Sequence, residues 1–133
     1  MMNKRAKGNR LENEVKEIFK SQGFTVHKTY PSLIYNRKTG RYFCRSNDVF
    51  ECFDLICKKK NEPTYWVQVT NDMKNKSNKE KKILERDIFN FEDRVEIWIK
   101  DKRKWRRFRM GTNFHTPEGR DFFEIENPEI IGI

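Results

Sequence analysis

Cysteine, glycine and proline are all scarce in this chain of 133 residues, with three, six and four copies respectively. No stretch rich in glycine, serine or proline marks a linker, and no segment repeats. A chain of this length has room for one modest core, so we expect a single domain over residues 1–133. We expect residues 1–6 to be flexible. For the C-terminal extension, residues 111–133, an edge strand and a dimer contact both remain open.

The few cysteines argue against a zinc site. Cys44, Cys52 and Cys57 are odd in number and show no CxxC pairing. His27 and His115 do not lie at a zinc-finger spacing from them. We therefore expect core thiols rather than metal ligands at these positions.

Long apolar runs are missing as well. No uncharged run is long enough to span a bilayer, and no apolar stretch follows the basic residues 1–10. We therefore expect a cytoplasmic protein that does not enter a membrane. What the chain has in excess is positive charge, with 29 lysines and arginines against 20 acids and a net charge of +9. Such a charge attracts polyanions, so nucleic acid is the expected partner.

Hydrophobic periodicity predicts helices that alternate with a larger number of strands. One helix is expected over residues 7–22, ended by Gly23. A second is expected from a capping box at Ser77 to about residue 89, with Ile88 on the buried side. Strands are expected over residues 24–28, 33–45 as a hairpin, 53–57, 65–70, 95–99 and 105–110. This order predicts an α/β fold, a single domain with a central mixed β-sheet flanked by helices.

One acid stands out in the strand over residues 53–57. Asp54 lies between Phe53, Leu55 and Ile56, and a carboxylate in such surroundings is costly to bury unless a cation or strong donors meet it. Binding of Mg²⁺ is one explanation, because that ion is typically held by one or two carboxylates together with water and phosphate oxygens. Pairing with an arginine, or capping of a turn, is the structural alternative.

Further polar groups lie within reach of such a site. The two-residue period of the strand over residues 65–70 places Gln68 and Thr70 on one face, so a suitable register lets both converge with Asp54. On the first helix, Glu12 and Glu14 lie about 75° and 85° to either side of the apolar direction. Periodicity does not choose between these two glutamates, and either is also compatible with a solvated helix charge.

Basic residues gather in two hairpins. The first, over residues 33–45, carries Arg41 and Arg45 together with other cations on its expected exposed face. The second places its cations around a tryptophan, which we predict to contact phosphates and to stack on an exposed base. Its predicted DNA-binding residues are Lys102, Arg103, Lys104, Trp105, Arg106 and Arg107.

Several short motifs, in order, resemble the archaeal-type Holliday junction resolvases and their phage relatives, a branch of the PD-(D/E)XK nucleases. Residues 7–12 (KGNRLE), followed by a helix and residues 23–26 (GFTV), are similar to that family's opening. Residues 53–56 (FDLI) resemble its strand with a metal-binding aspartate, and residues 66–70 (WVQVT) stand in the place of its Glu-x-Lys strand. The basic region over residues 98–109 resembles its closing hairpin.

The resemblance implies a restriction-endonuclease-like fold and selects Glu12 over Glu14. It implies that Glu12, Asp54 and Gln68 bind Mg²⁺ or Mn²⁺, and that Lys7 and Arg10 contact DNA. Gln68 replaces the family's acid and Thr70 its lysine, so we name Lys82, on the second helix, as a substitute cation. A glutamine carbonyl still ligates a metal but adds no negative charge.

The expected activity is therefore metal-dependent hydrolysis of phosphodiester bonds in branched DNA, at Holliday junctions in particular, as in DNA recombination. A homodimer is expected from the resemblance, since two nicks across a junction need two sites. A catalytically silent DNA-binding module on the same fold is the alternative that the Gln68 and Thr70 replacements motivate. An RNA-binding protein of unrelated fold is a third reading, and it leaves Asp54 unexplained.

Overall fold

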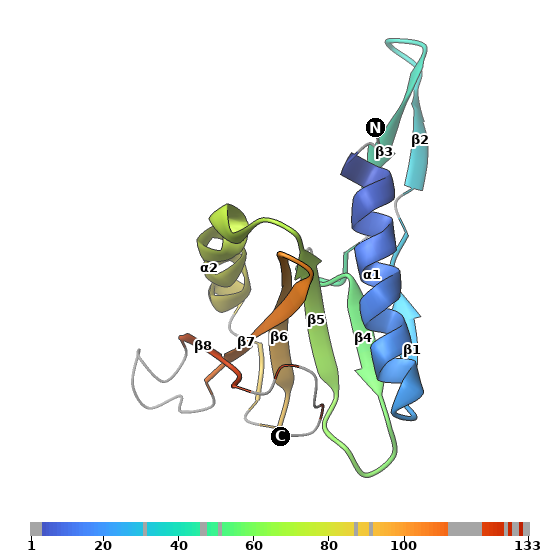
Figure 1. Cartoon of the computed structure of the whole chain (residues 1–133). Helices are drawn as coiled ribbons and strands as arrows, with labels where there is room; N and C mark the ends of the chain where they lie inside the picture. The colour runs from blue at the N-terminus through green and yellow to red at the C-terminus, as the bar shows by residue number, and fades with distance from the viewer. Residues whose placement is uncertain are drawn as a thin grey trace.

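The computed structural model places two helices on a mixed sheet of six strands (Figure 1). The sheet order is β1-β4-β5-β6-β7-β8, and a separate two-stranded sheet pairs β2 with β3. The structure describes residues 4–30, 32–45, 48–50, 52–86, 88–90, 92–111, 121–126, 128 and 131. Its elements are α1 (Lys4–Ser21), β1 (Thr25–Lys28), β2 (Ser32–Asn36), β3 (Arg41–Arg45), β4 (Leu55–Lys58), β5 (Tyr65–Thr70), η1 (Met73–Asn75), α2 (Lys76–Arg86), β6 (Arg94–Asp101), β7 (Lys104–Met110) and β8 (Phe122–Glu124).

The predicted α/β domain with a central mixed sheet is confirmed. Strand β5 runs parallel to β6, with α2 in the connection between them, whereas every other pair of neighbouring strands is antiparallel. A parallel pair needs such a crossover, and a helix is its usual form. Within the described ranges, no helix is both long and apolar enough to cross a membrane.

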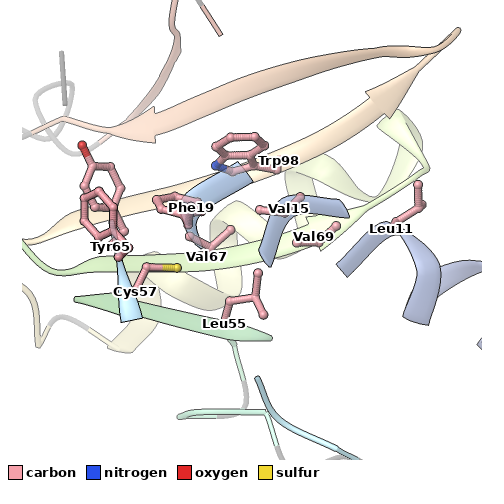
Figure 2. Close-up of a cluster of buried hydrophobic side chains, with 10 residues drawn as sticks. Leu11, Val15, Phe19, Leu55, Cys57, Tyr65, Val67, Val69 and Trp98 are labelled. Carbon is pink, nitrogen blue, oxygen red and sulfur yellow. The ribbon is translucent and has the colours of Figure 1, made fainter. Parts of the chain in front are cut away.

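The two helices lie on opposite faces of the sheet. Leu11, Val15 and Phe19 of α1 pack in one buried cluster with residues of β4, β5 and β6, including Val67 and Trp98 (Figure 2). A second cluster joins Ile83 of α2 to the residues of β6 that alternate with Trp98, namely Val95, Ile97 and Ile99. Because neighbouring residues of a strand point to opposite faces, each face of the sheet carries its own core.

Helix α1 ends as the sequence predicts. Gly23 has a φ of +89°, a left-handed conformation that favours glycine, and it follows directly on the last helical turn. Its N–H donates to the Lys20 carbonyl at 3.0 Å, and the Phe24 N–H donates to the Phe19 carbonyl at 3.1 Å. The helix begins at Lys4, so residues 4–6, which we expected to be flexible, are helical.

Two predictions about the second helix are wrong. The capping residue is Asp72, whose carboxylate accepts from the Lys74 N–H at the start of η1, and Ser77 lies inside α2. The helix ends at Arg86, so Ile88 lies beyond it and is half exposed. Phe89 instead packs against the aromatic rings of Phe53 and Trp66.

The C-terminal extension supplies at least an edge strand. Strand β8 pairs with β7, Ile125 is buried, and Ile131 packs against the cluster under α1. Residues 112–120, among them His115, lie outside the part of the chain that the structure describes. The alternative role of this extension in a dimer stays a prediction.

Candidate metal and phosphate site

The site lies where the first half of α1 crosses the sheet near the beginning of β4. Asn9, Glu12 and Asn13 are three and four residues apart on α1 and share one face of the helix. Opposite them is Lys28, the last residue of β1, whose ammonium donates to Asn9 Oδ1 at 2.6 Å and to Asn13 Oδ1 at 3.0 Å. The same ammonium lies 3.6 Å from Glu12 Oε2.

Lys28 is an unusual lysine, because only 5% of it is exposed. Lysine is seldom buried unless its charge is paired. Its strand partner is Leu55, so its side chain shares the face of the sheet that α1 covers. The structure therefore holds a positive charge in the interior, directly beside one of the predicted metal ligands.

Asp54 is the buried acid of this site. It is 5% exposed, and its Oδ2 accepts a hydrogen bond from the backbone N–H of Val69 at 2.9 Å. Its own backbone N–H donates to the Val67 carbonyl at 2.9 Å. Both ends of the residue are thus fixed to β5, so the carboxylate has a defined position at the point where β4 begins.

The carboxyl groups of Glu12 and Asp54 lie close enough for each to change the pKa of the other. Burial raises the pKa of Asp54 well above its ordinary value, and the negative charges of Glu12 and Asp48 raise that pKa further. Burial also raises the pKa of Glu12, while the interaction with Asp54 and the charge of Lys28 act in the opposite direction. Two acids so close need a proton or a cation between them.

These shifts link stability to pH with a definite sign. Both carboxyls hold their proton more tightly in the folded chain than in the unfolded one, so metal-free folding is favoured at low pH. Their contribution is complete below the ordinary aspartate value of 3.8 and is lost as the pH rises through the raised pKa values. A divalent cation that displaces the shared proton reverses this loss, so its binding strengthens as the pH rises.

A third acid approaches the pair from the loop before β4. Asp48 accepts a hydrogen bond at 3.3 Å from the hydroxyl of Thr29, which also donates to the Asp54 carbonyl at 3.3 Å. Within the described part of the chain, no three histidine, cysteine, aspartate or glutamate side chains are grouped closely enough to hold a metal by themselves. The pair Glu12 and Asp54 still fits Mg²⁺ or Mn²⁺, which typically keeps several water ligands beside one or two carboxylates.

Gln68 and Thr70 do not join this pair. They lie on β5, whose ladder with β4 begins at the Leu55–Val67 pair, one residue after Asp54 and one residue before Gln68. The Gln68 amide is buried and donates to the Val69 carbonyl at 3.3 Å. Thr70 Oγ1 accepts from the Asp72 N–H at 3.3 Å. Among the described residues, no hydrogen bond connects either side chain to Glu12 or Asp54.

Lys82, the predicted substitute cation, lies on α2. Its side chain is exposed, and its backbone carbonyl accepts a hydrogen bond from Cys52 Sγ at 3.8 Å. Helix α2 covers the face opposite to α1, whereas the Lys28 ammonium lies 3.6 Å from the Glu12 carboxylate. The structure therefore brings Lys28, rather than Lys82, to one of the predicted metal ligands.

Nine of the ten predicted DNA-binding residues fall into three groups. Arg10, Arg41 and the turn residues Lys102, Arg103 and Lys104 are exposed. Arg106 is bound by Glu124 at 2.8 Å, and Trp105 packs edge to face on Trp98 with ring centres 5.8 Å apart. The side chains of Lys7, in α1, and Arg45, in β3, lie outside what the structure describes.

Arg107 requires a correction. Its side chain has no exposed surface, and it forms a bidentate pair with the fully buried carboxylate of Glu96, with both distances 2.9 Å. Arg109 binds the same carboxylate at 2.7 Å, and Trp98 Nε1 donates to it at 2.8 Å. Arg107 thus belongs to the core, and the prediction that it contacts phosphate is wrong.

Sequence reasoning missed Lys28 and Asp48. A signal existed for the lysine, because Phe24, Val26 and Lys28 alternate along one strand and the first two are apolar, which places Lys28 on the buried face. No comparable signal marks Asp48, whose approach to Asp54 depends on the path of a loop.

Comparison of the chain with profiles of protein families, with curated proteins and with solved structures found no match.

Proposed function

We propose that the protein is a metal-dependent endonuclease of restriction-endonuclease-like fold that hydrolyses phosphodiester bonds in branched DNA, four-way junctions in particular. The observation that carries this proposal is the meeting of Glu12, from α1, with the buried Asp54 at the start of β4. A pair of desolvated acids beside a buried lysine fits a site for a divalent cation and a phosphate.

Each residue has a distinct part in this proposal. Glu12 and Asp54 would hold Mg²⁺ or Mn²⁺, and the side-chain carbonyl of Gln68 would be the third protein ligand. Such a metal would supply an activated water and would stabilise negative charge on the departing oxygen. Asp54 is kept in place by the Val69 N–H, and Lys28 orients Glu12.

Thr70 cannot provide the positive charge of the lysine that it replaces. Lys28 can provide this charge. Its ammonium is held by two asparagine side chains of α1 and lies 3.6 Å from Glu12 Oε2. A cation fixed in a partly desolvated site stabilises developing phosphate charge without reorganising during the reaction. We therefore assign to Lys28 the role that we first gave to Lys82.

The substrate and the assembly follow from the charge and from the resemblance. The net charge of +9 and the exposed cations around Arg10, Arg41 and the β6–β7 turn favour a DNA backbone. The homodimer supplies the two sites that two nicks across a junction need.

A catalytically silent DNA-binding module remains the second candidate. It is favoured by Gln68, which adds no negative charge to the site, and by the lack of a third clustered acid among the described residues. Such a module binds DNA equally well with metal or with chelator and cuts nothing.

Cleavage of a labelled four-way junction separates the two candidates. The wild-type protein is incubated with the junction, or with a linear duplex of matched sequence, in Mg²⁺, Mn²⁺ or EDTA. We expect nicks near the branch point in either metal, none in EDTA, and slower cutting of the duplex. Binding of the junction without cleavage in any metal contradicts the nuclease and supports the silent module.

A further inference from the structure

The hairpin formed by β2 and β3 stands apart from the rest of the molecule. Among the residues that the structure describes, its two strands pair only with each other, and Figure 1 shows the hairpin extending from the end of the sheet where β4 begins. Within the described residues, it has no extensive packing contact with another helix or strand. We call residues 32–45 the arm. A two-stranded hairpin is only marginally stable in water by itself, so a binding partner would stabilise the arm.

The arm exposes aromatic and aliphatic side chains to solvent. Tyr35 and Tyr42 are cross-strand partners with ring centres 5.1 Å apart, and they are 50% and 65% exposed. Leu33, on the same face, is 66% exposed, and Phe43, on the other face, is 47% exposed. Apolar surface on both faces of a projecting hairpin indicates a binding element.

The charge of the arm points to a nucleic acid as its partner. Residues 32–45 contain Arg37, Lys38, Arg41 and Arg45 and no aspartate or glutamate. The turn carries Arg37 and Lys38, both exposed, and Gly40 with a φ of +67° closes it. The arm of a second copy of this chain carries the same basic charge, so like-charge repulsion opposes pairing of one arm with another.

The base of the arm is attached to the carboxylate site. Thr29, just before the arm, and Asp48, just after it, are joined by a hydrogen bond of 3.3 Å, and the Thr29 N–H donates to the Asp54 carbonyl at 3.0 Å. Five-residue strands extend by roughly 17 Å. The arm therefore reaches about half the width of a small domain away from the site.

We propose that the arm is a stacking wedge, in which the Tyr35 and Tyr42 pair lies on base faces exposed at the branch point while Arg37 and Lys38 contact the flanking phosphates. In a continuous duplex each base pair is covered by its neighbours, whereas a branch point uncovers base faces. Aromatic side chains stack on any exposed base without sequence preference. The arm thereby supplies selectivity for branched DNA, an inference that rests on the proposed function for its choice of substrate.

The test measures binding in EDTA, where no cleavage interferes. The double variant Tyr35→Ser, Tyr42→Ser is compared with Phe123→Ser, which removes an equally exposed aromatic from β8. We expect affinity for a four-way junction to fall about tenfold in the double variant and to stay unchanged in the control. Affinity for a linear duplex should change less than twofold in either variant. A 2-aminopurine at the branch point should be quenched by the wild type and not by the double variant.

Three results would overturn the proposal. They are an unchanged junction affinity, an equal loss on junction and duplex, and conversion of a dimer into a monomer in sedimentation, which would make the arm a subunit contact. Circular dichroism checks that both variants are folded. If the wild type binds the junction through the tyrosines but never cuts it, the proposal that the arm is a wedge is supported and the proposed nuclease activity is contradicted. The two proposals can therefore fail independently.

Discussion

Replacing Glu96 with alanine is expected to destabilise the domain by at least ~3–5 kcal/mol, the range measured when one partner of a buried ion pair is removed. The Glu96 carboxylate has no exposed surface and binds Arg107, Arg109 and the indole of Trp98. Without it, two guanidinium groups in the core lose their main counter-charge. Because small domains are stable by only about 5–15 kcal/mol, most of the variant should be unfolded under mild denaturing conditions.

Urea denaturation followed by tryptophan fluorescence measures this effect. Glu124→Ala is the matched control, because it removes another arginine partner, that of Arg106, from an exposed pair. Exposed pairs contribute no more than ~1 kcal/mol. A loss below about 1 kcal/mol for Glu96→Ala would contradict the view that this carboxylate stabilises the core.

Lys28→Met should reduce the rate of metal-dependent junction cleavage by about 10²–10³-fold, the effect of removing one preorganised charge-stabilising group. Methionine keeps an unbranched chain in the buried space and removes the ammonium that contacts Asn9, Asn13 and Glu12. Junction affinity in EDTA should change little, because a buried lysine adds little to the exposed basic surface.

The control for Lys28 is Lys59→Met. Lys59 donates to the Gln22 carbonyl at 2.8 Å, in the turn that follows the far end of α1. The Lys59→Met variant should cut at the wild-type rate. Lys28→Arg should retain part of the activity, because arginine keeps the positive charge. If Lys28→Met cuts normally, or if its loss is matched by an equal loss of folded protein, Lys28 is only structural.

Local signals predicted most of the fold. Gly23 ends α1, the alternation over Tyr65–Thr70 gives β5 with its bounds, and the strands expected over residues 95–99 and 105–110 lie within β6 and β7. These features depend on residues close together in sequence. Predictions failed where distant residues decide, as for Ile88, because Phe89 takes the place against Phe53 and Trp66.

The site could be predicted only in part. A lone acid in an apolar strand identified Asp54, and the resemblance, rather than periodicity, chose Glu12 over Glu14, which instead pairs with Lys100 at 3.4 Å. Arg107 was mistaken for a surface cation because its partner Glu96 lies on the neighbouring strand, and strand register is not visible in the sequence. The contacts of Lys28 with Asn9 and Asn13 depend on how α1 packs on the sheet, which the sequence does not show either.

Binding of Mn²⁺ at mildly acidic and at neutral pH tests the central claim most directly. The claim is that Glu12 and Asp54 form a divalent-metal site. Calorimetry should find one Mn²⁺ per chain for the wild type, with affinity that rises with pH because the metal displaces the proton held by the raised pKa of Asp54. Asp54→Asn should lose this binding, and Glu14→Gln should keep it. Equal Mn²⁺ binding by Asp54→Asn and the wild type, or none by either, would contradict the account.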